Sequence, residues 1–233
     1  MKLHKSLFLA AIITLLLISN ASAQMFEGMI MMEITSPKFD KPMTMTISTK
    51  GDHSMFVMQM PQGNINLYID KASQKITMVM AAMNMGMEMP MTKPDKSTAG
   101  AAPKVEEIGD KQMINGHSCE LYRVTAQNGN QSNWWVTDDL PKSLLNSMKG
   151  VYNNSGSAMR STKGSAPGSE AIEAMFNKGL MPIRVEMLKD GKPATTMTFV
   201  KYEQKHLDDS VFIVPSDIKI QQMPAGMGGM GGQ

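Results

Sequence analysis

Methionines at alternate positions are the feature of this sequence that could bind a ligand most directly. Five of them stand two residues apart within one short stretch: Met83, Met85, Met87, Met89 and Met91. In an extended chain, side chains two residues apart project from the same side, about 6.5 Å from each other. Thioethers and thiolates select soft ions. The spacing therefore predicts a Cu(I) or Ag(I) site, with His117 and Cys119, which share one face of a later strand, as auxiliary ligands.

The same stretch also has the character of an apolar binding surface. Methionine is unbranched and polarizable, and proteins that accept varied apolar partners over-use it. In this hypothesis an apolar or acylated ligand lies against seven residues: Met78, Met80, Met83, Met85, Met87, Met89 and Trp134. Binding of such a ligand is the leading hypothesis for the function, and Cu(I) or Ag(I) binding is the alternative.

The composition supplies a purely structural explanation of these methionines. The chain has 27 methionines in 233 residues, and many of them, such as Met187 and Met197, stand beside Ile, Leu and Val in alternating segments. Such residues fill a core. A structural role in the cell envelope, through pairing of Cys119 with another chain or through an exposed strand edge, is the second alternative function.

Catalytic motifs are absent from the sequence, which has no H-E-x-x-H, no G-x-S-x-G and no Walker loop. His117 and Cys119 are two residues apart on a predicted strand, where an imidazole rarely meets a sulfur, and no acid is placed to orient the histidine. We therefore expect a protein that is not an enzyme. No cofactor is expected apart from copper(I) in the alternative hypothesis.

The first 23 residues have the pattern of a secretory signal peptide. Two lysines precede an apolar run over residues 7–18, and the small residues ASA before Gln24 form a cleavage site. The run is too short to span a bilayer, and no later segment is long and apolar enough. The sequence predicts an exported protein, periplasmic or extracellular, with no transmembrane segment. No cysteine follows the cleavage site, so no lipid anchor is expected.

The balance of charges argues against polyanionic partners. Cleavage after residue 23 would remove two of the 23 basic residues and none of the 21 acidic ones, which leaves a formally neutral chain. Nucleic acids and anionic membranes bind concentrated Lys and Arg, so neither is an expected partner. Cys119 is the only cysteine, which excludes a disulfide within the chain. The oligomeric state stays open.

Alternating segments predict antiparallel strands. Apolar and polar residues alternate over 43–48, 64–69 and 76–80, and the short turn-forming segments between them predict hairpins. Asn115-Gly116 is the strongest two-residue hairpin signal. Further strands are predicted on both sides of it and towards the end of the chain: 105–114, 117–126, 132–137, 183–187, 197–199 and 211–214. Short helices are predicted over 141–148 and 169–176.

These elements predict an α+β fold, in which a curved antiparallel sheet of roughly nine strands, an unclosed barrel, carries two short helices on one face. A single domain is expected over residues 24–222. Low-complexity composition predicts flexible insertions at 92–104 and 150–168 and a disordered Met/Gly tail at 223–233.

The methionine stretch contains a change of phase. Met78 and Met80 fall on even positions, whereas the methionines from Met83 onwards fall on odd ones. A slip of one residue at Ala81-Ala82 sends the second series to the opposite face of a strand unless a bulge absorbs it. The segment from Met83 is therefore predicted to be a frayed edge strand.

Several stretches resemble a family of exported bacterial proteins, the domain of unknown function 4412, which is itself similar to periplasmic lipoprotein carriers and lipoprotein-sorting proteins. The resemblance lies in IDKASQKITMVM, IGDKQMINGHSCELYRV, WWVTDDLP and LDDSVFIVP. Its most specific spacings are Gly116-x-x-Cys119-x-x-Tyr122 and Phe212-x-x-Pro215. The resemblance implies a barrel-like, unclosed sheet wrapped over helices, with an apolar cavity between them.

Overall fold

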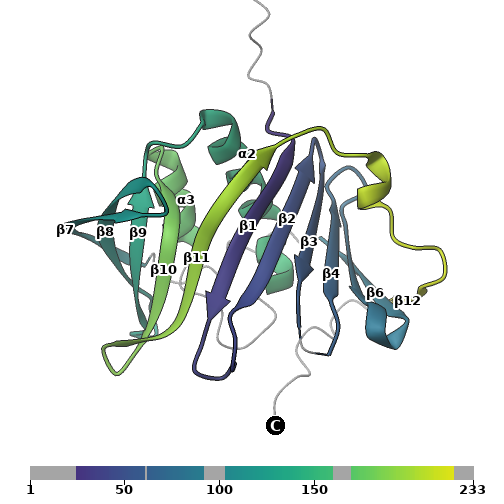
Figure 1. The fold of residues 1–233 in the computed structure, drawn as a ribbon, viewed down its shortest axis with the longest axis horizontal. Coiled ribbons are helices and arrows are strands. Elements are labelled where there is room, and N and C mark those ends of the chain that lie inside the picture. Colours follow the sequence, from purple (N-terminus) through teal and green to yellow (C-terminus); the bar gives the residue numbers. More distant parts are fainter. Residues whose placement is uncertain (1–24, 61, 92–102, 160–168, 223–233) are drawn as a thin grey trace, which may run out of the picture.

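One curved sheet of 12 strands organises the chain (Figure 1). The computed structural model describes residues 25–60, 62–91, 103–159 and 169–222. Along the sheet the strand order is β12-β6-β5-β4-β3-β2-β1-β11-β10-β9-β8-β7. The strands are β1 Gly28–Thr35, β2 Met43–Lys50, β3 His53–Met58, β4 Ile65–Asp70, β5 Lys75–Met80, β6 Met85–Pro90, β7 Lys104–Ile114, β8 His117–Thr125, β9 Gln131–Thr137, β10 Met181–Lys189, β11 Lys192–Gln204 and β12 Lys219–Gln222.

Neighbouring strands pair antiparallel, with one exception in the described part of the chain, because β12 runs parallel to β6. The period-two patterns of the sequence explain the meander from β1 to β6, in which each strand turns back beside its predecessor. At the predicted Asn115-Gly116 hairpin, both residues have positive φ, 49° and 86°, as a type I′ turn requires. Asn115 Nδ2 also donates to Phe199 O at 2.7 Å.

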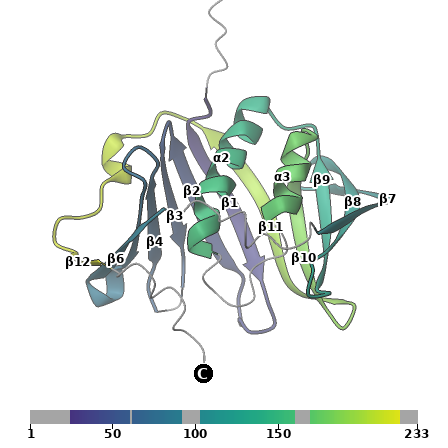
Figure 2. The ribbon, with the colours of Figure 1, turned by 180° about the vertical axis from the view of Figure 1, so that it is seen from behind.

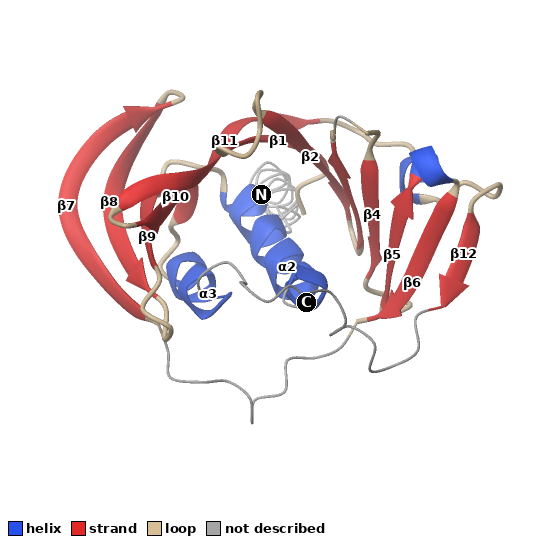
Figure 3. Cartoon of the chain, turned by 90° about the horizontal axis from the view of Figure 1, so that it is seen from below, coloured by secondary structure: helices blue, strands red, loops and turns tan. Residues whose placement is uncertain are grey.

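Two helices lie in the hollow of the sheet, α2 (Lys142–Met159) and α3 (Ser169–Asn177) (Figures 2 and 3). The long helix α2 crosses the middle of the concave face. Its buried residues Leu144, Met148 and Val151 join the main core with side chains of β1 to β5, and Ser147 Oγ lies 3.4 Å from Thr49 Oγ1 of β2. The concave face is therefore the core face.

The core has two parts. The larger one, under α2, includes Ile30, Ile47 and Phe56. The smaller one lies between α3 and strands β8 to β10 and holds seven buried residues: Tyr122, Val124, Trp134, Val136, Ala171, Met175 and Val185. Helix α3 contributes to both parts, because its Phe176 joins the larger core, whereas its Ala171 and Met175 join the smaller one.

The structure corrects several sequence-based predictions. The sheet has 12 strands instead of nine. Residues predicted as a strand over 211–214 instead belong partly to the 3-10 turn η3 (Asp209–Phe212), whose N-cap Asp208 accepts a hydrogen bond from Ser210 N. Helix α2 was predicted to end near Met148, but it continues to Met159, into the predicted flexible insertion.

Other predictions fall mainly on residues outside the described part. These are the signal peptide at 1–23, most of the 92–104 insertion, residues 160–168 and the 223–233 tail. Within the described residues, no helix is long and apolar enough to cross a membrane.

Candidate ligand-binding face

A tight turn brings the two series of methionines onto one face. Strand β5 ends at Met80, the 3-10 turn η1 (Ala81–Met83) follows, and Asn84 takes the left-handed conformation with φ 48°. The chain then returns as β6, so that Met80 pairs with Met85 and Met78 pairs with Met87. Paired residues of adjacent strands point to the same side. The change of phase at Ala81-Ala82 is therefore a chain reversal and not a slip within one strand.

The resulting surface, which we call the methionine face, consists of six half-buried side chains on the concave side of β3, β5 and β6: Met58, Met78, Met80, Met85, Met87 and Met89. Ile65 of β4 pairs with both Met58 and Met80 and continues the face. Met58, Met78 and Met89 partly pack against the main core. The face is thus an apolar extension of the core towards the β12 edge, beside α2 and not under α3 (Figure 3).

Strand β6 lies inside the sheet, whereas the sequence predicted a frayed edge strand. All four residues of β12 pair with β6 on its outer side. In this register Lys219 lies opposite Met85 and Ile220 lies opposite Gly86. Gly86 has no side chain, and a Cβ built there would lie 2.5 Å from Ile220 Cδ1. The short segment KIQQ carries no alternating apolar pattern of its own, so its place could not be predicted.

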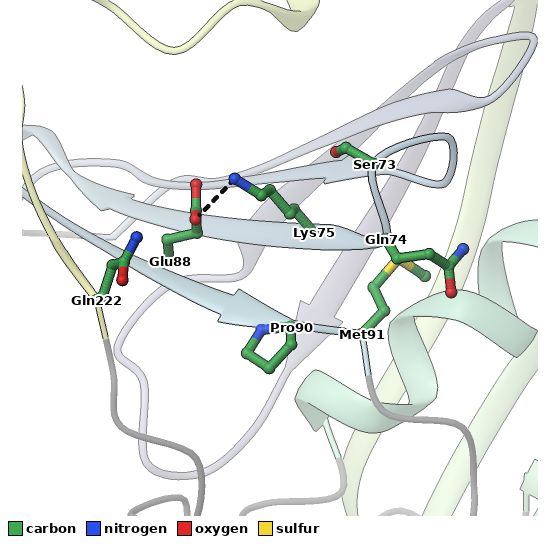
Figure 4. Close-up of a pocket in the computed structure, with 7 residues that line it drawn as sticks. All are labelled: Ser73, Gln74, Lys75, Glu88, Pro90, Met91 and Gln222. Atoms are coloured by element: carbon green, nitrogen blue, oxygen red, sulfur yellow. Dashed lines mark ion pairs between the residues drawn. The ribbon is translucent and has the colours of Figure 1, made fainter.

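The two ends of the methionine stretch, Met83 and Met91, lie outside the paired rows of this face, although Met91 packs partly against the main core as Met89 does. Met83 stands in the turn η1 with 68% of its surface exposed. Met91, whose N–H donates to Gln74 O at 2.8 Å, borders an open pocket of about 450 Å³ at the end of the β5–β6 hairpin (Figure 4). Five of the seven residues that line this pocket are polar or charged, and two of them, Lys75 and Glu88, form an ion pair of 3.0 Å. It is therefore a poor match for an apolar ligand.

His117 and Cys119 are far from the methionines, because eight strands separate β8 from β6 in the sheet. His117 Nδ1 lies 2.8 Å from Asp139 Oδ1, so an acid does orient this histidine, contrary to the prediction from the sequence. Burial tends to raise the pKa of Asp139, but hydrogen bonds to the side chains of His117 and Thr137 lower it overall. The structure thus gives His117 a structural partner and does not bring it to the predicted metal ligands. Among the described residues, no group of three or more His, Cys, Asp or Glu side chains could hold a metal ion.

Cys119 is closed off from solvent. Only 1% of its surface is exposed, its Sγ donates to His117 O at 3.5 Å, and burial raises the pKa of the thiol to about 11. Since the thiolate is the nucleophile and the soft ligand, this cysteine is poorly placed for pairing with another chain.

We expect Cys119 in the folded protein to react at pH 8 about 100-fold more slowly with a thiol-reactive disulfide than in the urea-unfolded chain, because its raised pKa lowers the thiolate fraction by about that factor. Absorbance of the released thiol measures the rate. The matched control is Ser118→Cys in a Cys119→Ser background, since Ser118 is exposed and should label promptly. Equal reaction rates for Cys119 and for the cysteine at position 118 would contradict the burial of the Cys119 thiol.

Trp134 does not belong to the methionine face. It is 1% exposed in the smaller core, and its Nε1 donates to Ser132 Oγ at 2.7 Å. The sequence signal was ambiguous because adjacent Trp134 and Trp135 must point to opposite sides of one strand. Conversely, Met58 was missed as a member of the face, because it lies on a strand that was not predicted.

Comparison with known proteins places the fold and the family. Residues 26–218 match the family described as a domain of unknown function, DUF4412. The chain belongs to this family. The resemblance noted in the sequence is confirmed, and the DUF4412 match covers nearly all the strands described above. No curated protein matches the sequence.

Solved structures are similar to this DUF4412 chain at low sequence identity. An uncharacterized conserved protein from Thermus thermophilus is 8% identical, with a TM-score of 0.51 over 84% of this chain and 91% of that one. MucB in complex with MucA(peri) is 8% identical, with a TM-score of 0.42 over 85% and 57% of the two chains. A DUF1329 family protein from Desulfovibrio piger is 8% identical, with a TM-score of 0.34 over 84% and 92%. The Thermus thermophilus protein supports the arrangement of sheet and helices.

Proposed function

We propose that this protein is an exported, non-enzymatic binding protein that holds an apolar or acylated ligand against the methionine face. The observation that carries the proposal is the cross-strand alignment of Met78 with Met87 and of Met80 with Met85, which gathers half-buried thioethers on one apolar surface. Export rests on the signal-peptide pattern of residues 1–23, whose removal would leave one domain over 24–222.

The chemistry of the face suits an acyl chain. In the paired rows of β3 to β6, the concave side carries Ser54, Phe56, Ile65, Leu67, Ile69 and Ile76 besides the six methionines, and no charged group. Burying a methylene group contributes about 0.8 kcal/mol. Ten buried methylenes would therefore contribute about 8 kcal/mol before the entropy of association is subtracted. Flexible methionines can adapt to chains of different shape.

Binding of Cu(I) or Ag(I) is a second candidate function, and one specific observation favours it. Two methionine pairs stand directly opposite each other on β5 and β6, where Cβ atoms are about 4.5–5.5 Å apart. Thioethers from both strands can therefore converge more easily than thioethers spaced along one strand. In this form the site uses Met78, Met80, Met85 and Met87 without His117 or Cys119.

Uptake of a fluorescent fatty acid by the full chain tests the first function. Wild type should bind it, and the triple variant Met80→Thr, Met85→Thr, Met87→Thr should bind at least about 10-fold more weakly, because three apolar side chains are shortened and made polar. The matched control is Met83→Thr, which lies in the exposed turn and should bind like wild type. Native mass spectrometry of gently extracted protein should show lipid-sized adducts.

A clean apo mass together with no uptake by wild type would overturn the proposal. Equal loss of uptake in the triple variant and in Met83→Thr would place the ligand elsewhere.

A further inference from the structure

A lysine, Lys219, stands at the β12 edge of the methionine face. Lys219 of β12 pairs with Met85, so its side chain projects from the concave side, as that of Met85 does. The next residue, Ile220, points to the opposite side, since its Cδ1 lies where a Gly86 Cβ would be. Lys219 is exposed, and among the described residues no carboxylate forms an ion pair with it.

The position of this lysine is built into the sheet. Gly86 does not have the positive φ that favours glycine, so its lack of a side chain has another cause. That cause is the close approach of Ile220 and Ile218, whose Cδ1 and Cγ2 atoms would lie 2.5 and 3.1 Å from a Cβ. The two isoleucines fill the space above Gly86 and hold β12 in register, which places Lys219 at the rim.

A continuous row leads from the lysine across the apolar surface. It consists of paired residues on five neighbouring strands: Lys219, Met85, Met80, Ile65 and Met58. At about 4.8 Å per strand, the row is about 19 Å long, comparable to an extended long-chain fatty acid. One end carries a positive charge, and the rest is apolar.

We propose that Lys219 recognises the carboxylate of a long-chain fatty acid whose tail lies along this row. The inference rests on the proposed function and adds the chemical class of the ligand. One lysine balances one negative charge, and its exposed position lets the head group keep its contact with water while the tail is buried. β12 thus forms the head-group end of the site, and the contact between Gly86 and Ile220 holds β12 in place.

The test compares the affinity of the full chain for palmitic acid with its affinity for hexadecanol, which has the same tail and no charge, at pH 8. Exposed ion pairs are worth about 0.2–1 kcal/mol, so the ratio of acid to alcohol affinity should fall about 1.4- to 5-fold in Lys219→Met. Lys219→Glu should lower the ratio further. Added salt should lower it in wild type and leave Lys219→Met unchanged.

Two further variants make the test specific. Lys71→Met is the matched control, since Lys71 lies in the turn after β4, near α2, and its loss should leave the ratio unchanged. Gly86→Val should displace Ile220 and lower the ratio as Lys219→Met does, while hexadecanol still binds.

The outcomes separate this inference from the proposed function. Failure of both palmitic acid and hexadecanol to bind wild type would overturn the proposed function and this inference with it. Binding of both, with a ratio that Lys219→Met and Lys219→Glu leave unchanged, would overturn only the role of Lys219. A ratio that falls in Lys71→Met instead would place the head group at the opposite end of the face.

Discussion

Trp134→Ala is expected to destabilise the protein by about 3–5 kcal/mol, as truncations of buried aromatic residues do. Trp134 is the largest side chain of the smaller core and is 1% exposed. Trp134 lies on β9 between its paired neighbours Tyr122 of β8 and Val185 of β10. Together with Met175 of α3, these side chains belong to the smaller core. A cavity there would loosen the docking of α3, because Ala171 and Met175 of that helix belong to this cluster.

Urea unfolding followed by circular dichroism measures this effect. Trp134→Phe should lose less stability than Trp134→Ala, because it keeps an aromatic ring. It still leaves the Ser132 hydroxyl, which is fully buried, without the indole N–H that donates to it at 2.7 Å. Ser132→Ala is the complementary variant and should cost about 1–3 kcal/mol because the buried indole N–H loses its acceptor. A change below about 1 kcal/mol in Trp134→Ala would contradict the packing described here.

The same variant separates a structural role of Trp134 from a role in ligand binding. The methionine face lies on the other half of the sheet, so the folded fraction of Trp134→Ala should bind a fatty acid with unchanged affinity. A direct contact with the ligand would instead weaken binding at conditions where the variant is fully folded.

Most strands could be predicted because half-buried strands alternate apolar and polar residues, as Ile65 to Ile69 do. The Asn115-Gly116 hairpin was equally clear, since few residues adopt two successive positive φ angles. β12 could not be predicted, because all four of its residues are exposed and its pairing depends on Gly86, 133 positions before Lys219. Similarly, the length of α2 was hidden by the Gly, Ser and Asn residues of its second half, which have low helix propensity.

The candidate site was only partly visible in the sequence. The density of methionine between Met78 and Met89 indicated the right segment but not the hairpin, because the pairing of Met80 with Met85 depends on the left-handed Asn84 at the end of η1. Spacing along one strand therefore gave the wrong geometry for a shared ligand. His117 and Cys119 were grouped with the methionines on ligand chemistry alone, and only the strand order separates them.

Replacing Met78, Met80, Met85 and Met87 by leucine is expected to abolish tight binding of Cu(I), if the second candidate function holds. Loss of partners outside the ligand shell typically costs 10- to 100-fold in metal affinity, so loss of the ligands themselves should exceed about 100-fold. Leucine keeps the face apolar and costs less than about 1.5 kcal/mol of stability per site. Titration against a competing Cu(I) chelator without oxygen measures the affinity.

The matched control is the double variant Met83→Leu, Met91→Leu, which removes thioethers from the same stretch but not from the paired rows. It should bind Cu(I) as wild type does. Equal, weak binding by wild type and by both variants would eliminate the metal site, whereas equal loss in both variants would favour ligands spaced along the stretch. Because the four leucines preserve apolar contact, that variant should still take up a fatty acid. The pair of measurements therefore tells whether the thioether sulfur or only the apolar surface is needed.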